Sequence, residues 1–372
     1  MKIEEADLYS FYCFDISEEV KLSQIETLLN KKAHESQLKL EKMAPSYMKF
    51  KIPPLLIRLP SFTEKFNEVE YSVKSYCKLY SFGTISIIFK TKFNGTSKEL
   101  RDFSNHLQNK REDFRKKAIA YVEKIVVEAK DSLISSNAFF PSEYYFLVHL
   151  KKLDKPLTAI EFQNDHKDLA LSIVTGDSGK LSDQTSYDIL RNSLSYSPDD
   201  FLLLYWNAGL LYDSEINFDS IDVIEFSVVQ LLELRYYDSL LENELDHAYD
   251  EVKESSDDKK LSKKDYSRAR DRLYLIKLSV SDVLEKLENN LKLVGDVYLS
   301  KIYNSASIAF HLKEWKISLD RKLDAVDDIY TFLNNKTEYK KSVSHETLIL
   351  TLEIIVVILI LWEVLYPLFF NH

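Results

Sequence analysis

The sequence predicts an α+β protein: a mixed N-terminal domain of sheet and helix, then a long antiparallel helical hairpin, then a single C-terminal transmembrane helix. Three observations carry this prediction. Short β-rich runs alternate with helical patterns before residue 215, residues 222–335 contain no proline and one glycine, and a long apolar run lies near the C-terminus. The expected domains are 1–215 for the soluble α+β domain, 216–341 for the helical hairpin or stalk, and 348–370 for the transmembrane helix.

Strands are expected where β-branched and aromatic residues gather in short runs. These runs are FYCFDI at 11–16, KLYSFGTISIIFK at 78–90, EYYFLVHL at 143–150 and DLALSIVTG at 168–176, with FLLLYWNAGLLYD at 201–213 as a further candidate. Apolar residues at helical spacing predict helices over 25–40 and 100–133. Four prolines between residues 45 and 60 predict a loop there.

The region after residue 222 is patterned for packed helices. One apolar stripe runs from Leu231 to Val252, and a second runs from Tyr266 to Leu291 in alternating steps of three and four. The polar stretch 253–264 between them predicts an antiparallel hairpin. A third stripe, from Leu312 to Leu333, continues toward the membrane segment. A bundle within one chain is favoured over a coiled coil between chains, and both remain open for different helices.

Residues Leu348 to Phe370 form a 23-residue apolar run that predicts one membrane span. At about 1.5 Å per residue this helix is roughly 34 Å long, and a hydrocarbon core is about 30 Å thick. The alternative is a buried core helix. Lys336, Lys340 and Lys341 precede the span, so the positive-inside rule places the N-terminal domain in the cytoplasm and the translocated C-terminus across the membrane.

Two carboxylates, Glu353 and Glu363, lie inside this span. An ionised glutamate near the bilayer centre costs a few kcal/mol by insertion scales. Glu353 can reach the near interface, whereas Glu363 lies deeper and is expected to be protonated, hydrogen-bonded to a partner helix or reached by water. Self-association through the span is the preferred use, and snorkelling without a role is the alternative. One span gives little basis for a channel or pump.

Composition and motifs argue against most chemistries. The net charge of −10 makes nucleic-acid binding unlikely, six glycines leave no phosphate-binding loop, and the N-terminus shows no targeting signal. Cys13 and Cys77 are expected to be buried apolar residues in a reducing compartment. The GDSGK peptide at 176–180 is interpreted as a turn, and the single Glu244/His247 pair as an exposed helix face. We therefore expect no cofactor, no metal and no catalytic residue.

Several segments resemble the family named for "required for meiotic nuclear division", the RMD-like proteins with bacterial YagE-like members. The tail LEIIVVILILWEV and the helix DRKLDAVDDIYTFL at 320–333 carry the resemblance, and YSFGTISIIF at 80–89 and WNAGLLYD at 206–213 follow in the same order. The resemblance implies a membrane-anchored protein without an established enzymatic activity. A mitochondrial member of that family supports organellar translation at the inner membrane.

The leading functional hypothesis is a non-enzymatic, tail-anchored membrane scaffold. Its cytosolic α+β domain and helical stalk would be presented to a protein or ribonucleoprotein partner at the lipid bilayer. One alternative is an enzyme whose site forms on the acidic helix of residues 235–250, around Arg235, Glu244, His247 and Asp250. Another is membrane-proximal RNA binding through the basic cluster 259–272, although a solvated loop is favoured there.

Overall fold

The computed structural model describes residues 1–31, 39–41, 52–136, 140–177, 181–213, 218–254, 263–290 and 297–370. It confirms the α+β class, with a sheet domain followed by helices that include an apolar helix at the C-terminal end. The chain forms two compact units. Unit 1 holds residues 1–237 and 282–317, and unit 2 holds residues 238–281 and 318–372. The domain boundaries expected from the sequence (1–215, 216–341 and 348–370) stay a prediction.

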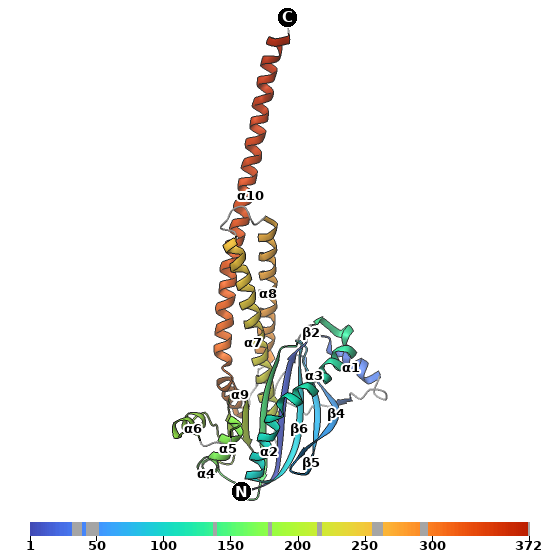
Figure 1. Ribbon diagram of the computed structural model, residues 1–372, viewed down its shortest axis with the longest axis vertical. Coiled ribbons are helices and arrows are strands. Elements are labelled where there is room, and N and C mark those ends of the chain that lie inside the picture. The colour runs from blue at the N-terminus through green and yellow to red at the C-terminus, as the bar shows by residue number, and fades with distance from the viewer. Residues whose placement is uncertain are drawn as a thin grey trace. The chain divides into compact units, whose positions relative to one another are not determined.

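Unit 1 is built on an eight-stranded sheet with the order β3-β4-β5-β6-β1-β8-β10-β9 (Figure 1). All neighbouring strands are antiparallel except β8 and β10, which run parallel. A separate two-stranded sheet pairs β2 with β7. The bounds are β1 Lys2–Asp15, β2 Ser17–Val20, β3 Lys39–Glu41, β4 Leu55–Phe66, β5 Val69–Leu79, β6 Thr84–Thr96, β7 Leu133–Ser136, β8 Ser142–Leu153, β9 Phe201–Leu204 and β10 Ala208–Tyr212.

Ten α-helices and one short 3₁₀ turn, Lys130–Ser132, are defined in the described residues. Short helices follow the strands, and three long ones close the chain. Their bounds are α1 Leu22–Lys31, α2 Ser97–Asn109, α3 Arg111–Glu128, α4 Ala159–Asp165, α5 Lys167–Thr175, α6 Asp183–Leu190, α7 Phe218–Glu254, α8 Lys263–Asn290, α9 Val297–Ala309 and α10 Leu312–Phe370.

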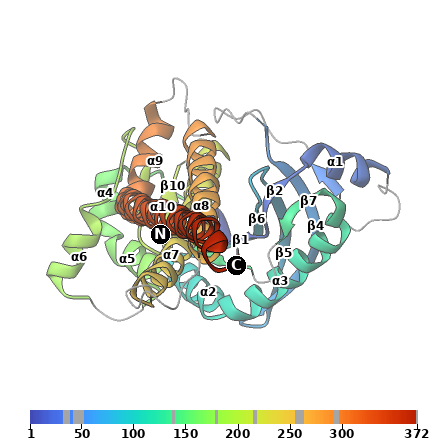
Figure 2. The same cartoon turned by 90° about the horizontal axis from the view of Figure 1, so that it is seen from above.

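The two faces of the sheet differ in polarity because successive strand residues point to opposite sides. On β1, Leu8, Tyr12 and Phe14 enter an apolar core that also holds Phe103 of α2 and Phe114 of α3. Helices α2 and α3 follow this side of the sheet (Figure 2). The alternate β1 residues Asp7, Cys13 and Asp15 are also buried, on the face that packs against α7. One face is therefore apolar, and the other buries charge.

Most predicted strands are confirmed, and two N-terminal predictions are wrong. Residues 168–176 were expected to form a strand, but 167–175 form α5, whose residues 169–174 are all buried. A short helix buried on every side has the same unbroken apolar run as a buried strand. Residues 55–60 were expected in a loop but belong to β4, where Pro60 falls at a register shift between Leu59 and Phe62. Proline is tolerated at such irregularities because it cannot donate to the ladder.

Other segments carry more structure than expected. The candidate strand at 201–213 is the hairpin of β9 and β10. The predicted helix over 25–40 is wrong at its end, because α1 ends at Lys31 and residues 39–40 belong to β3, while residues 32–38 lie outside the described residues. Helix α9 was not predicted. Its polar residues interrupt the apolar spacing, although Leu299, Ile302 and Ala306 are buried.

Unit 2 is a helical bundle formed by 238–254 of α7, 263–281 of α8 and the part of α10 after residue 318. Ion pairs join all three helices. Arg272 lies 2.7 Å from Glu244, Lys277 lies 2.6 Å from Asp327, and Lys322 lies 2.8 Å from Asp238. The Arg272 to Glu244 pair connects α7 with α8, as the predicted helical hairpin requires. Helix α10 continues without interruption into the apolar segment.

Candidate functional site

A pocket of about 250 Å³ opens in unit 1 where five elements meet, and we call it the arginine pocket. The start of α3 contributes Arg111, Glu112 and Arg115, and the start of β8 contributes Ser142, Glu143 and Tyr144. The remaining lining residues come from β1, the β9–β10 turn and α7, and are Tyr12, Trp206, Asn207, Leu231 and Arg235. Pairing of β8 with both β1 and β10 brings these segments together.

Two arginines of α3 form one wall. Arg111 and Arg115 are four residues apart, so both side chains lie on the same face of the helix. Arg115 Nη2 donates to Ser142 Oγ at 3.3 Å, and Arg111 Nε lies 3.8 Å from Glu112 Oε1. Among the described residues, no carboxylate oxygen lies within 4.0 Å of Arg115. Most donors of that guanidinium therefore remain available to a ligand.

The opposite wall holds a cation that is already engaged. Arg235 Nη1 lies 2.7 Å from Glu143 Oε1, and its guanidinium carbon lies 5.6 Å from the ring centre of Trp315. Burial raises the pKa of the Glu143 carboxyl, against the opposing effect of Arg235. Glu143 thus holds the Arg235 side chain in place, and burial favours the neutral, protonated form of its own carboxyl group.

An aromatic ring and an amide complete the pocket from the turn between β9 and β10. Trp206 is 61% exposed, which is unusual for so large an apolar ring. The Asn207 carbonyl accepts from Phe146 N at 3.0 Å and so fastens the turn to β8. The buried Asn207 Oδ1 has no hydrogen-bond partner among the described residues. The turn therefore presents a stacking surface and an unsatisfied polar group.

The chemistry of the lining favours binding an anion over catalysis. Three arginines face two glutamates, a formal balance of +1 that rises to +2 when Glu143 is neutral. Guanidinium groups match phosphate and carboxylate oxygens with paired hydrogen bonds. Within the part of the chain that the structure describes, no three metal-ligating side chains converge.

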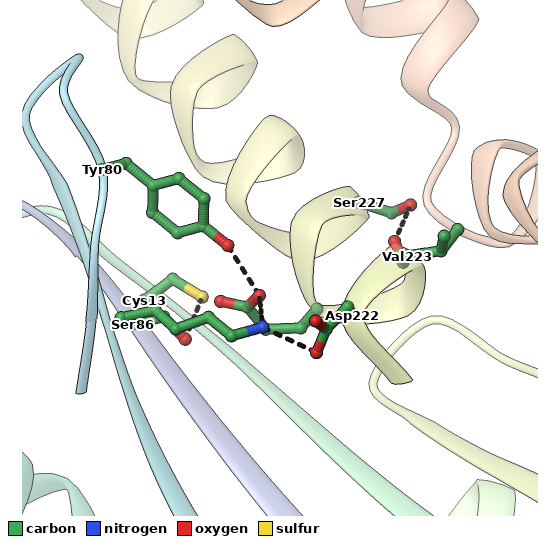
Figure 3. Close-up of polar contacts among 8 residues, drawn as sticks. Cys13, Tyr80, Ser86, Asp222, Val223 and Ser227 are labelled. Carbon is green, nitrogen blue, oxygen red and sulfur yellow. Dashed lines mark hydrogen bonds and ion pairs between the residues drawn. The ribbon is translucent and has the colours of Figure 1, made fainter. Parts of the chain in front are cut away.

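A second polar feature lies under α7, where the sheet buries an ion cluster. Lys78 of β5 is 2.7 Å from Asp222 Oδ1 and 3.3 Å from Glu225 Oε2, and Tyr80 donates to Glu225 at 2.7 Å. Figure 3 shows Tyr80 and Asp222 approaching this cluster from the sheet and from α7, above Cys13 and Ser86. Burial opposes the charge on Lys78, but Asp222 and Glu225 outweigh it and raise the pKa of the ammonium.

Two further buried groups extend this face of the sheet. Asp7 lies 2.9 Å from Lys90 and 2.8 Å from Lys151, and these cations lower its pKa despite its burial. Nearby, burial lowers the pKa of His149 to about 4. Closer to the end of β1, Thr84 donates to Glu233 of α7, and burial and then the charge of Asp15 raise the pKa of Glu233. The contacts of Lys78, Tyr80 and Thr84 hold α7 to the sheet, whereas the pairs of Asp7 join neighbouring strands. None of these groups lines the arginine pocket.

The structure places the site residues expected from the sequence on α10. Glu353 lies on an exposed part of that helix, among apolar side chains. Glu363, Lys336, Lys340 and Lys341 are also on α10, but their side chains lie outside the described set. The apolar stretch Ser342–Trp362 is long and apolar enough to cross a membrane, and its described side chains are exposed. The C-terminal segment therefore meets the requirements of length and composition for a span.

The alternative sites have different outcomes. Of the four residues proposed for an enzyme, Arg235 lines the arginine pocket, Glu244 pairs with Arg272, and His247 and Asp250 are exposed. In the basic cluster 259–272, Lys259 and Lys260 lie outside the described residues, and Arg272 is engaged by Glu244. Gly176 of GDSGK ends α5 in a left-handed conformation, as the turn interpretation expects.

Both cysteines are fully buried, as predicted. Burial raises the pKa of the Cys13 and Cys77 thiols, which disfavours a nucleophilic thiolate. Sequence reasoning did not single out Arg111, Arg115 or Trp206 as site residues: the arginines lie in a predicted helix, and Trp206 lies in a candidate strand that was also used for the family resemblance. The signal available was the pair of arginines four residues apart and the tryptophan beside Asn207 in a short apolar run.

Comparison with known proteins corrects the family expected from the sequence. The family model described as "Uncharacterized protein MJ0711, N-terminal domain" matches residues 5–219. A relative, Uncharacterized protein MJ0711 of Methanocaldococcus jannaschii, is 26% identical over 219 residues. That match covers 56% of this chain and 63% of the relative, which is less than two thirds of its length. No solved structure matches.

The resemblance to RMD-like and YagE-like proteins is therefore wrong, because the matching family is a different one. The peptides that suggested it, at 320–333 and in the apolar part of α10, are short, the first an amphipathic helix and the second an apolar one, and many unrelated helices share such patterns. They also lie outside the matched residues 5–219.

Proposed function

We propose that this chain, which belongs to the family of the MJ0711 N-terminal domain, is a non-enzymatic membrane scaffold. One helix attaches it to the bilayer, and its sheet domain and helical stalk bind a protein or ribonucleoprotein partner. The observation that carries the proposal is the apolar stretch of α10, Ser342–Trp362, whose side chains are exposed over a length sufficient to span a membrane. Exposed apolar surface of this extent is unfavourable in water and favourable in lipid.

The proposed orientation keeps the sheet domain in the cytoplasm. Lys336, Lys340 and Lys341 precede the apolar stretch, and basic residues next to a span are retained on the cytoplasmic side. Self-association through the span is part of the proposal. Glu353 and Glu363 would then find hydrogen-bonding partners in a second copy of the helix instead of facing lipid alone.

Membrane attachment is tested with the full chain tagged at its N-terminus, beside a variant that ends at Lys341. We expect the full chain to resist carbonate extraction and its tag to be accessible only from the cytoplasmic side, whereas the shortened chain becomes soluble. A full chain recovered in the soluble fraction would disprove attachment. Digestion of the tag by protease added outside intact cells would disprove the orientation alone.

Self-association is tested separately by crosslinking in membranes, comparing the full chain with Glu353→Leu and Glu363→Leu variants. We expect a dimer band that weakens in at least one variant while membrane recovery stays unchanged. Dimer bands of equal intensity in all three proteins would show that neither glutamate contributes to self-association.

The enzyme alternative keeps one supporting observation. The arginine pocket gathers Arg235 with Glu143, Glu112 and two more cations, which is the convergence of carboxylates and cations that such a site needs. Turnover of a ligand held in this pocket would favour an enzyme over a scaffold. RNA binding through residues 259–272 stays a weaker alternative, and it requires affinity that falls steeply with salt.

A further inference from the structure

The arginine pocket has the composition of a ligand site, and its features are independent of membrane attachment. Every residue of its lining belongs to unit 1, and the pocket is separate from the apolar stretch of α10. Its volume of about 250 Å³ lies just below the roughly 300–1,000 Å³ of ordinary ligand sites. The volume therefore suits a small ligand.

Arg111 and Arg115 favour a negatively charged group at one end of that ligand. Arg111 and Arg115 project from the same face of α3, and Arg115 uses one of its N–H groups in the hydrogen bond to Ser142. Arg111 is the first residue of α3, whose N-cap residue Lys110 makes no side-chain cap hydrogen bond. A compact, multiply charged anion such as a phosphate monoester can accept from both guanidinium groups at once.

The turn between β9 and β10 favours a planar, polar group at the other end of the ligand. Trp206 exposes its ring beside the pocket, where a planar group can stack on it. Asn207 brings an amide whose Oδ1 is buried without a partner among the described residues. Because the Oδ1 position is enclosed by protein, contact with a base edge falls to the other amide atom of Asn207, which donates as assigned and accepts if the amide is flipped.

We propose that the arginine pocket binds a mononucleotide, with the phosphate on Arg111 and Arg115 and the base on Trp206. Glu143 has a positioning role, because it holds Arg235 on the far wall at 2.7 Å. The proposal goes beyond the scaffold function and is tested independently of it. It assigns a small ligand to unit 1, whereas the scaffold function concerns a macromolecular partner of the whole protein.

The test is calorimetric titration of the full chain in detergent micelles. The probes are the four ribonucleoside monophosphates, inorganic phosphate and adenosine. We expect at least one nucleotide to bind ten-fold or more tightly than inorganic phosphate and than adenosine. Arg115→Gln and Trp206→Ala should each weaken that binding ten-fold or more. The matched control is Arg191→Gln, at an exposed arginine that caps the C-terminus of α6 and does not line the pocket, which should leave the affinity unchanged.

Each contrary result overturns the proposal. If inorganic phosphate binds as tightly as the nucleotides, the base contributes nothing to binding. If adenosine binds as tightly as the nucleotides, the phosphate contributes nothing. Equal weakening by Arg191→Gln indicates attraction to surface charge, and absence of binding by all four nucleotides rejects the ligand class. A variant counts as folded when its thermal midpoint lies within about 2 °C of the unsubstituted protein, because a small change in stability shifts the midpoint by roughly that amount. A misfolded Trp206→Ala is replaced by Trp206→Leu, which keeps bulk and removes the aromatic face.

Discussion

Lys78 of β5 and Asp222 of α7 form an ion pair of 2.7 Å on a sheet face that α7 covers, and the Lys78 side chain is only 7% exposed. Glu225 and Tyr80 complete the hydrogen bonds of the cluster. A buried charge without a partner is far more costly than a surface one, so each member depends on the others. This pair joins the end of β5 to the first turns of α7.

Lys78→Met should destabilise unit 1 by about 3–5 kcal/mol, because it leaves the buried Glu225 and the partly buried Asp222 without their cation. Denaturant unfolding of the full chain in micelles measures the change. Lys65→Met is the matched control, since its pair with Glu68 is exposed on both sides and its midpoint should hardly move. Equal losses in the two variants would mean that the buried cluster has no special role.

Stability should fall as the pH drops from about 6.5 to about 4, through the titration of His149. Its folded pKa of about 4 lies below the value of an unfolded histidine, so the unfolded chain binds the extra proton in this window. The contribution is about 3 kcal/mol at full effect. His149→Gln should flatten the pH dependence of the thermal midpoint, and His247→Gln, at an exposed position, should not. An unchanged slope in His149→Gln would contradict the assignment.

Glu233→Gln should stabilise the protein at pH 8 and have little effect at pH 4. The folded pKa of Glu233 is raised, so its favourable contribution is present below the unfolded pKa and is lost as the pH rises through the folded value. A neutral amide avoids that loss and can still accept from Thr84. Thermal midpoints at both pH values check this, with the exposed Glu123→Gln as control. A variant less stable than the original at pH 8 would show that the charge is favourable.

Gly83→Ala should be much more destabilising than Gly176→Ala. Both glycines have positive φ, but a Cβ at Gly83 would stand 1.5 Å from the Ser17 carbonyl oxygen, whereas at Gly176 the nearest atom is the Gln108 Oε1, 3.2 Å away. A flexible side chain can move, but the backbone of β2 cannot do so without breaking its pairing. Gly176→Ala should cost about 1 kcal/mol, and Gly83→Ala several times more. Unfolding in urea gives both values.

The sequence predicted what local periodicity encodes. Alternating runs located β1, β6 and β8, and helical stripes located α7, α8 and α10. It failed for α5, because a buried helix and a buried strand share an unbroken apolar run. Charges at alternate strand positions, such as Lys78 and His149, were a usable sign of a polar sheet face.

The arginine pocket could not be predicted in the same way. It needs Arg115, Glu143 and Trp206 in one place, and that follows from the strand order that sets β8 between β1 and β10. Strand order is a long-range property, and no local pattern records it.

The position of β1 in the middle of the sheet has a consequence for biosynthesis. Its neighbours are β6 and β8, so residues 2–15 leave the ribosome well before residues 84–96 and 142–153. At about 5–20 residues per second, this strand waits for several seconds without either neighbour. The nascent chain thus exposes an aromatic-rich strand early, and its yield in cells will depend on the chaperones that meet it during translation.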